Sequence, residues 1–369
     1  MEVREVKTKK DIRDFVNFQF DLYKESAYWV PPIKADEIKQ LDKNHNPAFR
    51  FCDAGFWTIW QNGKCVGRIG AIINKLYNEK TGKKFGRFSR VEFIDDPKVS
   101  KLLFETAENW LKERGMEFVH GPLGFTNIDN QGLLIEGFDF LPSIASVYHY
   151  PYYQKHIEKL GYKKENDWVE FRLTIEEIPE KAQRLADLIK KRNNLEVVHF
   201  KSKNDMKVYL RDVFHLLNKA FAELPYVAPF PDDLIDSLAS KYFKVLNPKY
   251  IVVIKKEGKL VAFIVGLPSL SEAMQKAKGK LFPFGFIHIV KAMNNPEVMD
   301  LLLTGVDPDY QKLGLPAILI NELQHAIIEN GIKFVETTGM FETNQKGIAH
   351  WKSYKHIQHK RRRAFIKKL

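Results

Sequence analysis

Cysteine is scarce in this chain, and its apolar runs are short. Only Cys52 and Cys65 occur among the 369 residues, too few for a disulfide framework or a zinc site of paired cysteines, so we expect packing residues in a reducing compartment. No apolar run approaches the ~20 residues that a membrane-spanning helix needs. Residues 1–6 lack the features of a secretory signal. We therefore expect a cytoplasmic protein without a membrane span.

Signatures of several common chemistries are missing as well. The eleven histidines are scattered rather than set at the spacing of metal ligands. No Ser-His-Asp order and no Walker phosphate-binding loop stands out. We therefore expect no metal, and the chemistry has to be sought in other motifs.

The composition that is present describes a globular protein of two domains. Hydrophobic residues make up 44% of the chain and charged residues 28%, which is the balance of an ordinary folded protein. A length of 369 residues exceeds one ordinary core and suits two.

The net charge is basic, and much of the excess lies at the C-terminus. The chain has 58 Lys and Arg against 46 Asp and Glu, a net charge of +12. This favours a polyanionic partner such as nucleic acid, an anionic membrane surface or a phosphate-bearing small molecule. In residues 355–369 apolar side chains interrupt the cations. We interpret this segment as a solvated terminal strand or tail, with a nucleic-acid-binding stripe as the alternative.

One order of elements occurs twice along the chain, at a nearly constant offset. Each copy runs from a short strand and a helix to a hairpin, then to a third strand, a helix and a fourth strand. The hairpins span residues 56–69 and 250–264, and their turns, Asn62-Gly63 and Glu257-Gly258, supply the glycine that tight hairpins accept at positive φ. The pattern predicts an α/β sandwich with a mixed central sheet.

Two loop regions interrupt this plan. In the second copy an insertion between hairpin and third strand holds a capping-box pattern at 269–272 and a phenylalanine-rich run at 279–286. The run is interpreted either as a lid or pocket wall or as the cover of a core edge. In the first copy residues 120–138 place short polar side chains among glycines after a strand, which predicts either a substrate-recognition loop or a structural turn.

The sharpest local signal is the strand, loop and helix start over residues 303–317. Backbone N–H groups at the start of a helix have no intrahelical acceptor and face the positive end of its dipole, which suits a phosphate group. Gly314 permits close approach of an anion. Pro316 lies where a missing N–H costs little in a first turn.

Residues 306–317 resemble the acyl-coenzyme A loop of the GNAT acyltransferase superfamily. That loop has Arg or Gln, two residues, Gly, one residue, and then Gly or Ala; Gln311 and Gly314 fit, while Pro316 departs at the last position and removes one backbone donor. The resemblance continues through 331–335 to Asn344 and the segment 351–354. In the first copy 153–162 is similar to the family's Tyr-Glu-Lys-Leu-Gly-Phe ending, but the loop 94–100 has no matching glycine.

This resemblance implies an α/β fold of two tandem GNAT-like domains, each a mixed, mostly antiparallel sheet flanked by helices. The expected divisions are an N-terminal domain with a degenerate cofactor loop (1–173), a linker helix (174–194) and a C-terminal domain that binds acyl-coenzyme A (195–369). The implied activity is transfer of an acyl group, usually acetyl from acetyl-coenzyme A, to an amine. The implied cofactor-binding residues are Val306, Gln311, Lys312, Leu313, Gly314, Leu315, Ala317 and Asn344.

Three catalytic tasks follow from the resemblance. A backbone N–H around Val306 polarises the thioester carbonyl. Glu336 takes the ammonium proton, with Asp307 or Glu342 as the next candidates. Tyr354 protonates the leaving thiolate, although Trp351 falls nearer the family's usual spacing after Asn344.

Two other functions remain as alternatives at this point. One is a GNAT scaffold without transfer activity that binds coenzyme A or another anionic ligand, and the other is a nucleic-acid binder that uses the basic C-terminus. For the acyltransferase the expected partner is a small-molecule or peptide amine, without a membrane and without nucleic acid. The acceptor, the acyl chain length and the oligomeric state do not follow from the sequence.

Overall fold

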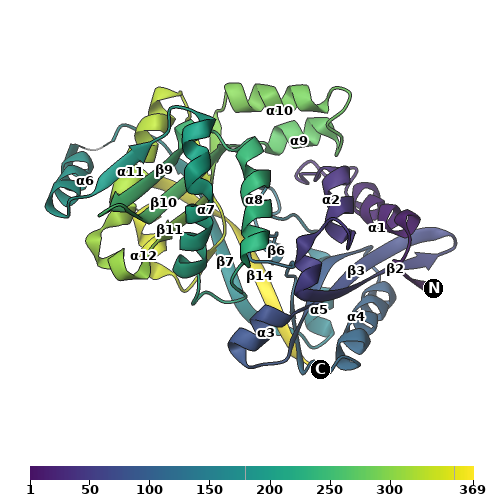
Figure 1. Cartoon of the computed structure of the whole chain (residues 1–369). Coiled ribbons are helices and arrows are strands. Elements are labelled where there is room, and N and C mark those ends of the chain that lie inside the picture. Colours follow the sequence, from purple (N-terminus) through teal and green to yellow (C-terminus); the bar gives the residue numbers. More distant parts are fainter. Residues whose placement is uncertain (179, 353) are drawn as a thin grey trace.

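A computed structural model describes residues 1–178, 180–352 and 354–369. These residues form one continuous 14-stranded sheet with helices packed against it (Figure 1). Pro179, in the expected linker helix, and Ser353, in the last aromatic segment, lie outside the described residues.

The first half of the chain supplies seven strands and five α-helices of the described structure. The strands are β1 (Glu2–Glu5), β2 (Cys52–Gln61), β3 (Lys64–Asn74), β4 (Phe85–Phe93), β5 (Phe118–Gly121), β6 (Leu133–Glu136) and β7 (Lys163–Thr174). The helices are α1 (Lys9–Leu22), α2 (Lys34–Leu41), α3 (Lys75–Thr81), α4 (Pro97–Lys112) and α5 (Tyr152–Lys159), with a 3-10 turn at Pro47–Arg50.

The second half repeats this inventory with an insertion. Its strands are β8 (Glu196–His199), β9 (Ile251–Lys256), β10 (Lys259–Pro268), β11 (Val298–Val306), β12 (Phe334–Thr337), β13 (Met340–Phe341) and β14 (Lys355–Lys368). Its helices are α6 (Glu180–Arg192), α7 (Lys203–Ala220), α8 (Asp232–Val245), α9 (Ser271–Ala277), α10 (Gly285–Asn294), α11 (Leu315–Glu329) and α12 (Gln345–Lys352), with 3-10 turns at Pro248–Tyr250 and Pro308–Leu313.

The sheet confirms the internal repeat. Its order is β1-β2-β3-β4-β5-β14-β7-β12-β11-β10-β9-β8, so the two halves run in mirrored order outward from the central pair β14 and β7. Neighbouring strands are antiparallel except β4 with β5 and β11 with β12, which are parallel. Each half is therefore a mixed, mostly antiparallel sheet, as expected.

Local sequence signals explain why both halves begin alike. Thr8 before α1 and Ser202 before α7 each accept a hydrogen bond from a backbone N–H three residues later, in matching capping boxes. The hairpin turns place Asn62 at φ 50° and Glu257 at φ 51°, each followed by a glycine at positive φ. These are the paired left-handed positions of a tight hairpin turn, so both predicted hairpins are confirmed.

Helices cover both faces of the sheet in the second half. α11 packs over Leu301 and Val335 on one face. α7 lies against the opposite face and, with α8, contributes to a core that includes Val253 and Val265. Because side chains alternate along a strand, this division assigns every residue of β11 and β12 to one face or the other.

The basic C-terminal segment is the strand that joins the two halves. β14 pairs with β7 over nearly its whole length and meets β5 over Phe365–Lys368 (Figure 1). Phe365 is fully buried. The expectation of a strand is correct, but the expectation that it is solvated is wrong, because β5 and β6 cover one edge of β14 and β7 covers the other, all of them from the first half.

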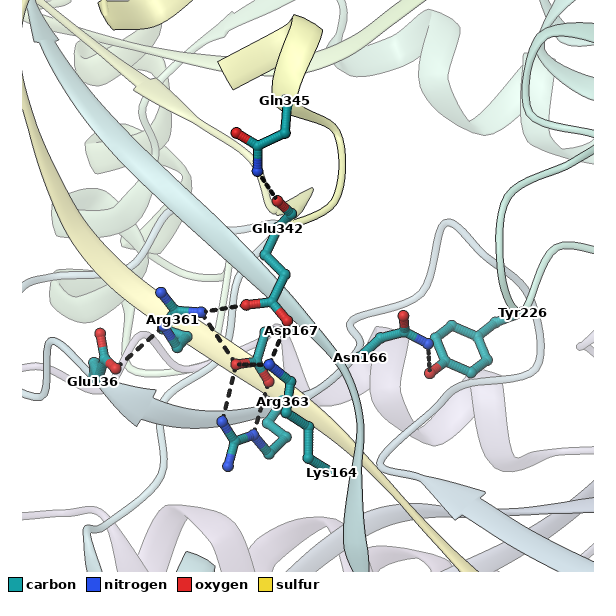
Figure 2. Close-up of polar contacts among 9 residues, drawn as sticks. All are labelled: Glu136, Lys164, Asn166, Asp167, Tyr226, Glu342, Gln345, Arg361 and Arg363. Atoms are coloured by element: carbon teal, nitrogen blue, oxygen red, sulfur yellow. Dashed lines mark hydrogen bonds and ion pairs between the residues drawn. The ribbon is translucent and has the colours of Figure 1, made fainter. Parts of the chain in front are cut away.

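Carboxylates of the sheet neutralise the cations of β14. Asp167 accepts hydrogen bonds from Arg363 at 2.7 and 2.9 Å and from Arg361 at 3.1 Å (Figure 2). Arg362 donates to Glu170 at 2.6 Å. These ion pairs occupy the arginines that suggested a nucleic-acid-binding stripe, and they hold the C-terminal strand to the first half.

Candidate functional site

The two central parallel strands of the second half separate partway along their length. β11 pairs with β12 only over Val298–Leu301, opposite Phe334–Thr337, although β11 continues to Val306. The register between β11 and β10 shifts at this point, which leaves Leu302 as an extra residue. Such bulges redirect backbone groups and side chains and are frequent beside active sites.

Two carboxyl groups lie side by side where the strands separate. Asp300 and Glu336 are direct neighbours in the β11–β12 register. Leu301 and Val335, next to them in sequence, pack under α11, so both carboxyl groups project from the opposite face. Asp300 is fully buried and Glu336 is 7% exposed.

A histidine from the C-terminal strand completes this cluster. The register between β14 and β7 shifts between Gln358 and Lys360, so His359 is a bulged residue. Its Nε2 lies 2.6 Å from Oε2 of Glu336. Arg172 of β7 approaches the other oxygen of Glu336 at 3.4 Å. Asp300, Glu336 and His359 are called the central cluster below.

Within the central cluster, burial shifts the titration of the Asp300 carboxyl toward neutral pH. It raises the pKa of the Asp300 carboxyl to about 8, and the neighbouring Glu336 carboxylate contributes to the rise. Neither oxygen of Asp300 has a hydrogen bond of normal geometry within the described structure. At neutral pH Asp300 is therefore mostly protonated beside Glu336, so the pair is able both to accept and to donate a proton.

A loop of the first half forms the roof of the cluster. The ring of Phe140 lies 5.2 Å from that of His359, centroid to centroid. Lys360 donates to the carbonyl oxygens of Gly137, at 3.1 Å, and Phe140, and burial lowers the pKa of its ammonium group to about 8. The site is thus built from both halves and is shielded from water.

An apolar pocket lies beside the cluster on the same side of the sheet. It is enclosed by α7, α8 and strands β9 to β11. Leu302, two residues beyond Asp300, lines it, and Ile128 from the glycine-rich loop of the first half closes one side. Its other lining residues are Phe200, Met206, Tyr209, Leu210, Val213, Phe214, Leu217, Tyr242, Leu246, Ile251, Val253, Val265 and Leu303.

The predicted cofactor loop lies at the far end of β11. Residues 308–313 form a 3-10 turn, Gly314 has φ 75°, and α11 begins at Leu315. Lys219 of α7 fixes the loop through Asp307, at 2.8 Å, and Asp309, at 2.7 Å.

Gly314 is needed here for two reasons. Its φ is left-handed, and a Cβ on it would lie 3.1 Å from Cδ1 of Ile189 in α6. Its neighbours divide by exposure: Leu315 is fully buried and Leu313 packs on the core, whereas Gln311 and Lys312 are exposed. A ligand is therefore able to contact Leu313 and Leu315 only through their backbone, whereas the side chains of Gln311 and Lys312 are accessible to it.

Other predicted residues of the cofactor site serve the fold. Val306 ends β11 opposite Ala262. Ala317 lies in the first turn of α11, where its N–H bonds to the carbonyl of Gly314 at 3.1 Å. Asn344 accepts a hydrogen bond from the N–H of Gly347 at 3.0 Å at the start of α12. Their roles toward coenzyme A stay predictions.

The structure does not bring Tyr354 together with Glu336. The hydroxyl of Tyr354 donates to Gln324 of α11 at 3.0 Å, so the ring lies on the face opposite the central cluster. The two other carboxylates considered as bases, Asp307 and Glu342, are engaged with Lys219 and Arg361. Glu336 is the candidate that lies in a buried acid–base cluster.

Asp300 and His359 were missed by the sequence analysis. Asp300 had a signal, since it is the charged residue within the apolar run 298–303. His359 had none, because a strand bulge places it and it lies within the basic segment 355–369. Among the described residues no group of three His, Cys, Asp or Glu side chains is arranged to hold a metal ion.

The matching region of the first half is closed by aromatic residues. Tyr153 of α5 donates to Glu92 at 2.8 Å and accepts from the N–H of Phe93, at the end of β4, at 3.0 Å. Tyr23 also donates to Glu92. At the register position that matches Asp300 and Glu336, the first half has Arg87 of β4 opposite His120 of β5, so the two halves share a plan but differ there.

Comparison with solved structures defines the class of fold. A tandem GNAT protein from the clavulanic acid biosynthesis pathway superposes with a TM-score of 0.56 at 12% identity, over 100% of this chain and 98% of that one. A GCN5-related N-acetyltransferase from Sphaerobacter thermophilus gives a TM-score of 0.54 at 10% identity, over 99% of this chain and 95% of its own. The chain has the tandem GNAT fold, which confirms the expected fold class and the resemblance.

Sequence relatives define the family more narrowly, although no protein-family model matches. Protein YghO of Escherichia coli (strain K12) is 30% identical over 354 residues, covering 93% of this chain and 89% of its own length. Bacterial ceramide synthase of Caulobacter vibrioides is 26% identical over 374 residues, covering 96% of each chain. The chain therefore belongs to the same family as protein YghO, and it has the tandem GNAT fold.

Proposed function

We propose that this protein is an acyl-coenzyme A-dependent N-acyltransferase whose reaction takes place at the central cluster. The observation that carries the proposal is the pairing of Asp300 with Glu336 where β11 and β12 separate, with His359 against Glu336. A buried group with a pKa near neutrality and a second carboxylate beside it are what proton transfer from an amine requires.

The loop before α11 fits the diphosphate of the acyl donor. The first-turn N–H groups of this helix lack intrahelical acceptors, and the helix dipole favours an anion there. The positive φ of Gly314 presents its backbone, and the exposed Lys312 adds a positive charge nearby. Pro316 removes one donor from this set, and the N–H of Ala317 already donates to the carbonyl of Gly314, so the amides of Gly314 and Leu315 carry the contact.

Within the cluster, each group has a distinct task. Glu336 accepts the proton of the ammonium group, and His359 and Arg172 hold its carboxylate in place. The amine nitrogen attacks the thioester carbonyl, so that a C–N bond forms and the C–S bond breaks. A backbone N–H of β11 at the bulge, near Leu302, takes the task assigned from sequence to the region of Val306.

Two groups are candidates to protonate the leaving thiolate. Tyr354 is the choice implied by the family resemblance, but its hydroxyl donates to Gln324 on the other face of the sheet. Asp300 is protonated at neutral pH and lies beside Glu336. We propose Asp300 as the donor, and matched variants of the two residues separate the alternatives.

The apolar pocket and one relative point to a long-chain substrate. The pocket beside Asp300 has a free volume of only about 40 Å³, but its aliphatic and aromatic lining suits an alkyl chain for which these side chains move apart. A relative that is similar over 96% of this chain is a bacterial ceramide synthase. We propose that the acceptor is a long-chain amine and that the preferred donor is a long-chain acyl-coenzyme A and not acetyl-coenzyme A. One of the two alkyl chains, from the donor or from the acceptor, would occupy this pocket.

Release of free thiol tests the proposal. The purified protein is mixed with acyl-coenzyme A donors from acetyl to long-chain, each with short-chain and long-chain primary amines. The proposal expects amine-dependent thiol release that increases with chain length. Binding of coenzyme A without thiol release for any pair would instead assign a scaffold without transfer activity, an alternative favoured by Pro316 and by the closeness of Ile189 to Gly314.

A further inference from the structure

The helical insertion of the second half exposes a cluster of large apolar side chains. The turn between α9 and α10 and the first turns of α10 carry Phe282, 77% exposed, Phe284, 70% exposed, and also Phe286, Ile287 and Val290. No residue of α10 is buried. The interpretation of this run as the cover of a core edge is therefore wrong, because these side chains face solvent. These five residues are called the apolar tip below.

Basic residues surround the apolar tip. Lys276, Lys278, Lys280 and Lys291 are exposed, and the chain has no acidic residue between Glu272 and Glu297. Apolar patches of this kind on a folded protein mark a surface that another molecule covers. The positive charge of these lysines favours a negatively charged partner.

The base of the insertion is fixed on the first half. Gln275 of α9 donates to the backbone carbonyls of Ala27 and Trp29 at 2.8 and 3.1 Å. The carbonyl of Gly279 accepts from the N–H of Lys34 at 2.9 Å. Figure 1 shows α9 and α10 along the upper edge of the molecule, with α10 outermost. The apolar tip is thus presented by an anchored support.

We propose that α9 and α10 form a docking element that inserts the apolar tip into the interfacial region of a bilayer containing anionic lipids. Helices that lie in a membrane surface combine an apolar face, often aromatic, with lysines that reach the headgroups. No described helix is both long and apolar enough to cross a membrane, so the contact is with one surface. This proposal replaces the expectation that a membrane is not a partner.

A second copy of this chain is disfavoured as the occupant. A twofold interface brings the same patch of two copies together. The lysines around the two tips would then face each other, and Glu272, the carboxylate of α9, already pairs with Lys276 at 3.5 Å. An anionic lipid surface has no such conflict.

The docking element also has a defined relation to the central cluster. The N–H of Ser269, just before α9, donates to the carbonyl of Val298 at 2.8 Å, two residues from Asp300. Ser271 in the first turn of α9 donates to the carbonyl of Pro142 in the roof loop at 2.7 Å. Docking would therefore place the roof of the cluster next to the lipid surface.

Vesicle co-sedimentation tests this proposal with the full-length protein. The probes are phosphatidylcholine vesicles with and without phosphatidylglycerol, at low and high salt. We expect the protein to pellet with the anionic vesicles, and less so at high salt. Two triple variants should each bind the anionic vesicles at least about tenfold more weakly than the wild type. One is Phe282→Ser with Phe284→Ser and Ile287→Ser, and the other is Lys278→Gln with Lys280→Gln and Lys291→Gln.

A matched control removes exposed apolar side chains elsewhere. Leu188→Ser with Val208→Ser changes side chains that are 62% and 72% exposed on α6 and α7, and it should bind vesicles as the wild type does. The proposal is overturned if the wild type does not pellet or if the phenylalanine variant pellets equally well. A dimer that the phenylalanine variant abolishes, without vesicle binding, would assign the tip to a second copy.

This test is independent of the proposed function. The tip residues touch neither the central cluster nor the predicted cofactor loop, so thiol release with water-soluble substrates should be the same in the variants. Loss of vesicle binding with retained thiol release supports the docking element alone. Absence of thiol release in every variant and in the wild type, with vesicle binding intact, would overturn only the acyltransferase.

Discussion

Nε2 of His359 lies 2.6 Å from Oε2 of Glu336, although the two residues come from β14 and β12, which β7 separates in the sheet. The contact exists because His359 bulges out of β14. It makes the C-terminal strand part of the candidate site as well as the link between the halves.

Glu336→Gln should lower turnover by about 10²–10⁴-fold. The amide has nearly the same shape but does not accept the ammonium proton, while the loop before α11 is unchanged. Thiol release measures turnover, and calorimetry with coenzyme A should give unchanged affinity. Glu342→Gln is the matched control, since this half-exposed carboxylate pairs with Arg361 outside the cluster; equal losses in both variants would contradict the assignment.

Asp300→Asn should change how stability depends on pH. The folded protein raises the pKa of Asp300 from 3.8 to about 8, so between these values the native state keeps a proton that the unfolded state has released. The free energy of unfolding therefore falls as pH rises through this window, by at most about 1.4 kcal/mol per pH unit from this group. Below and above the window the contribution is constant.

Urea unfolding of the wild type and Asp300→Asn, from about pH 5 to about pH 9, measures this difference. The wild-type value minus the variant value should decline and then level off above about pH 8. Parallel curves would show that Asp300 titrates normally.

Asp300→Asn and Tyr354→Phe should differ in turnover. If Asp300 protonates the thiolate, its amide slows thiol release by about 10²-fold or more, whereas Tyr354→Phe loses one hydrogen bond to Gln324, a stability cost of about 0.5–1.5 kcal/mol. The initial rate of thiol release for each variant decides between them. A slow Tyr354→Phe beside a normal Asp300→Asn would restore the tyrosine to the role implied by the family.

Gly314→Glu should weaken binding of coenzyme A by about tenfold or more, because the carboxylate repels the diphosphate and the side chain meets Ile189. Gly63→Glu is the matched control. Gly63 has φ 76°, close to the 75° of Gly314, but its Cβ position is open and lies in the turn between β2 and β3 of the first half. Calorimetry should show normal affinity for this control. Normal affinity for Gly314→Glu would place the cofactor elsewhere.

Phe365→Ala should destabilise the protein by about 3–5 kcal/mol, since this side chain of β14 is fully buried in the core of the first half. Ile357→Ala in the same strand, where the side chain is 48% exposed, should change stability by less than about 1 kcal/mol. Denaturant unfolding measures both. Similar costs would show that β14 does not bury its outer end in the core of the first half.

The features that could be predicted from the sequence are those set by near neighbours. The turns at Asn62 and Glu257 depend on a following glycine, and the helix starts at Thr8 and Ser202 depend on an acid three residues later. Such signals fix hairpins and helix boundaries, and their repetition revealed the duplicated plan.

The features that could not be predicted depend on pairing between distant strands. Nothing near residues 355–369 indicates that they insert between β5 and β7, because their partners lie in the other half of the chain. The cluster is formed in the same way: Glu336 was found by analogy, but Asp300 and His359 join it only through the register of β11 with β12 and the bulge in β14.

Thiol release from a long-chain acyl-coenzyme A in the presence of a long-chain primary amine, measured for the wild type and Glu336→Gln side by side, shows most directly whether the central cluster catalyses acyl transfer. We expect amine-dependent release by the wild type and a loss of at least about 10²-fold in the variant. Equal rates for the two proteins, or no release by the wild type with any amine, would contradict it.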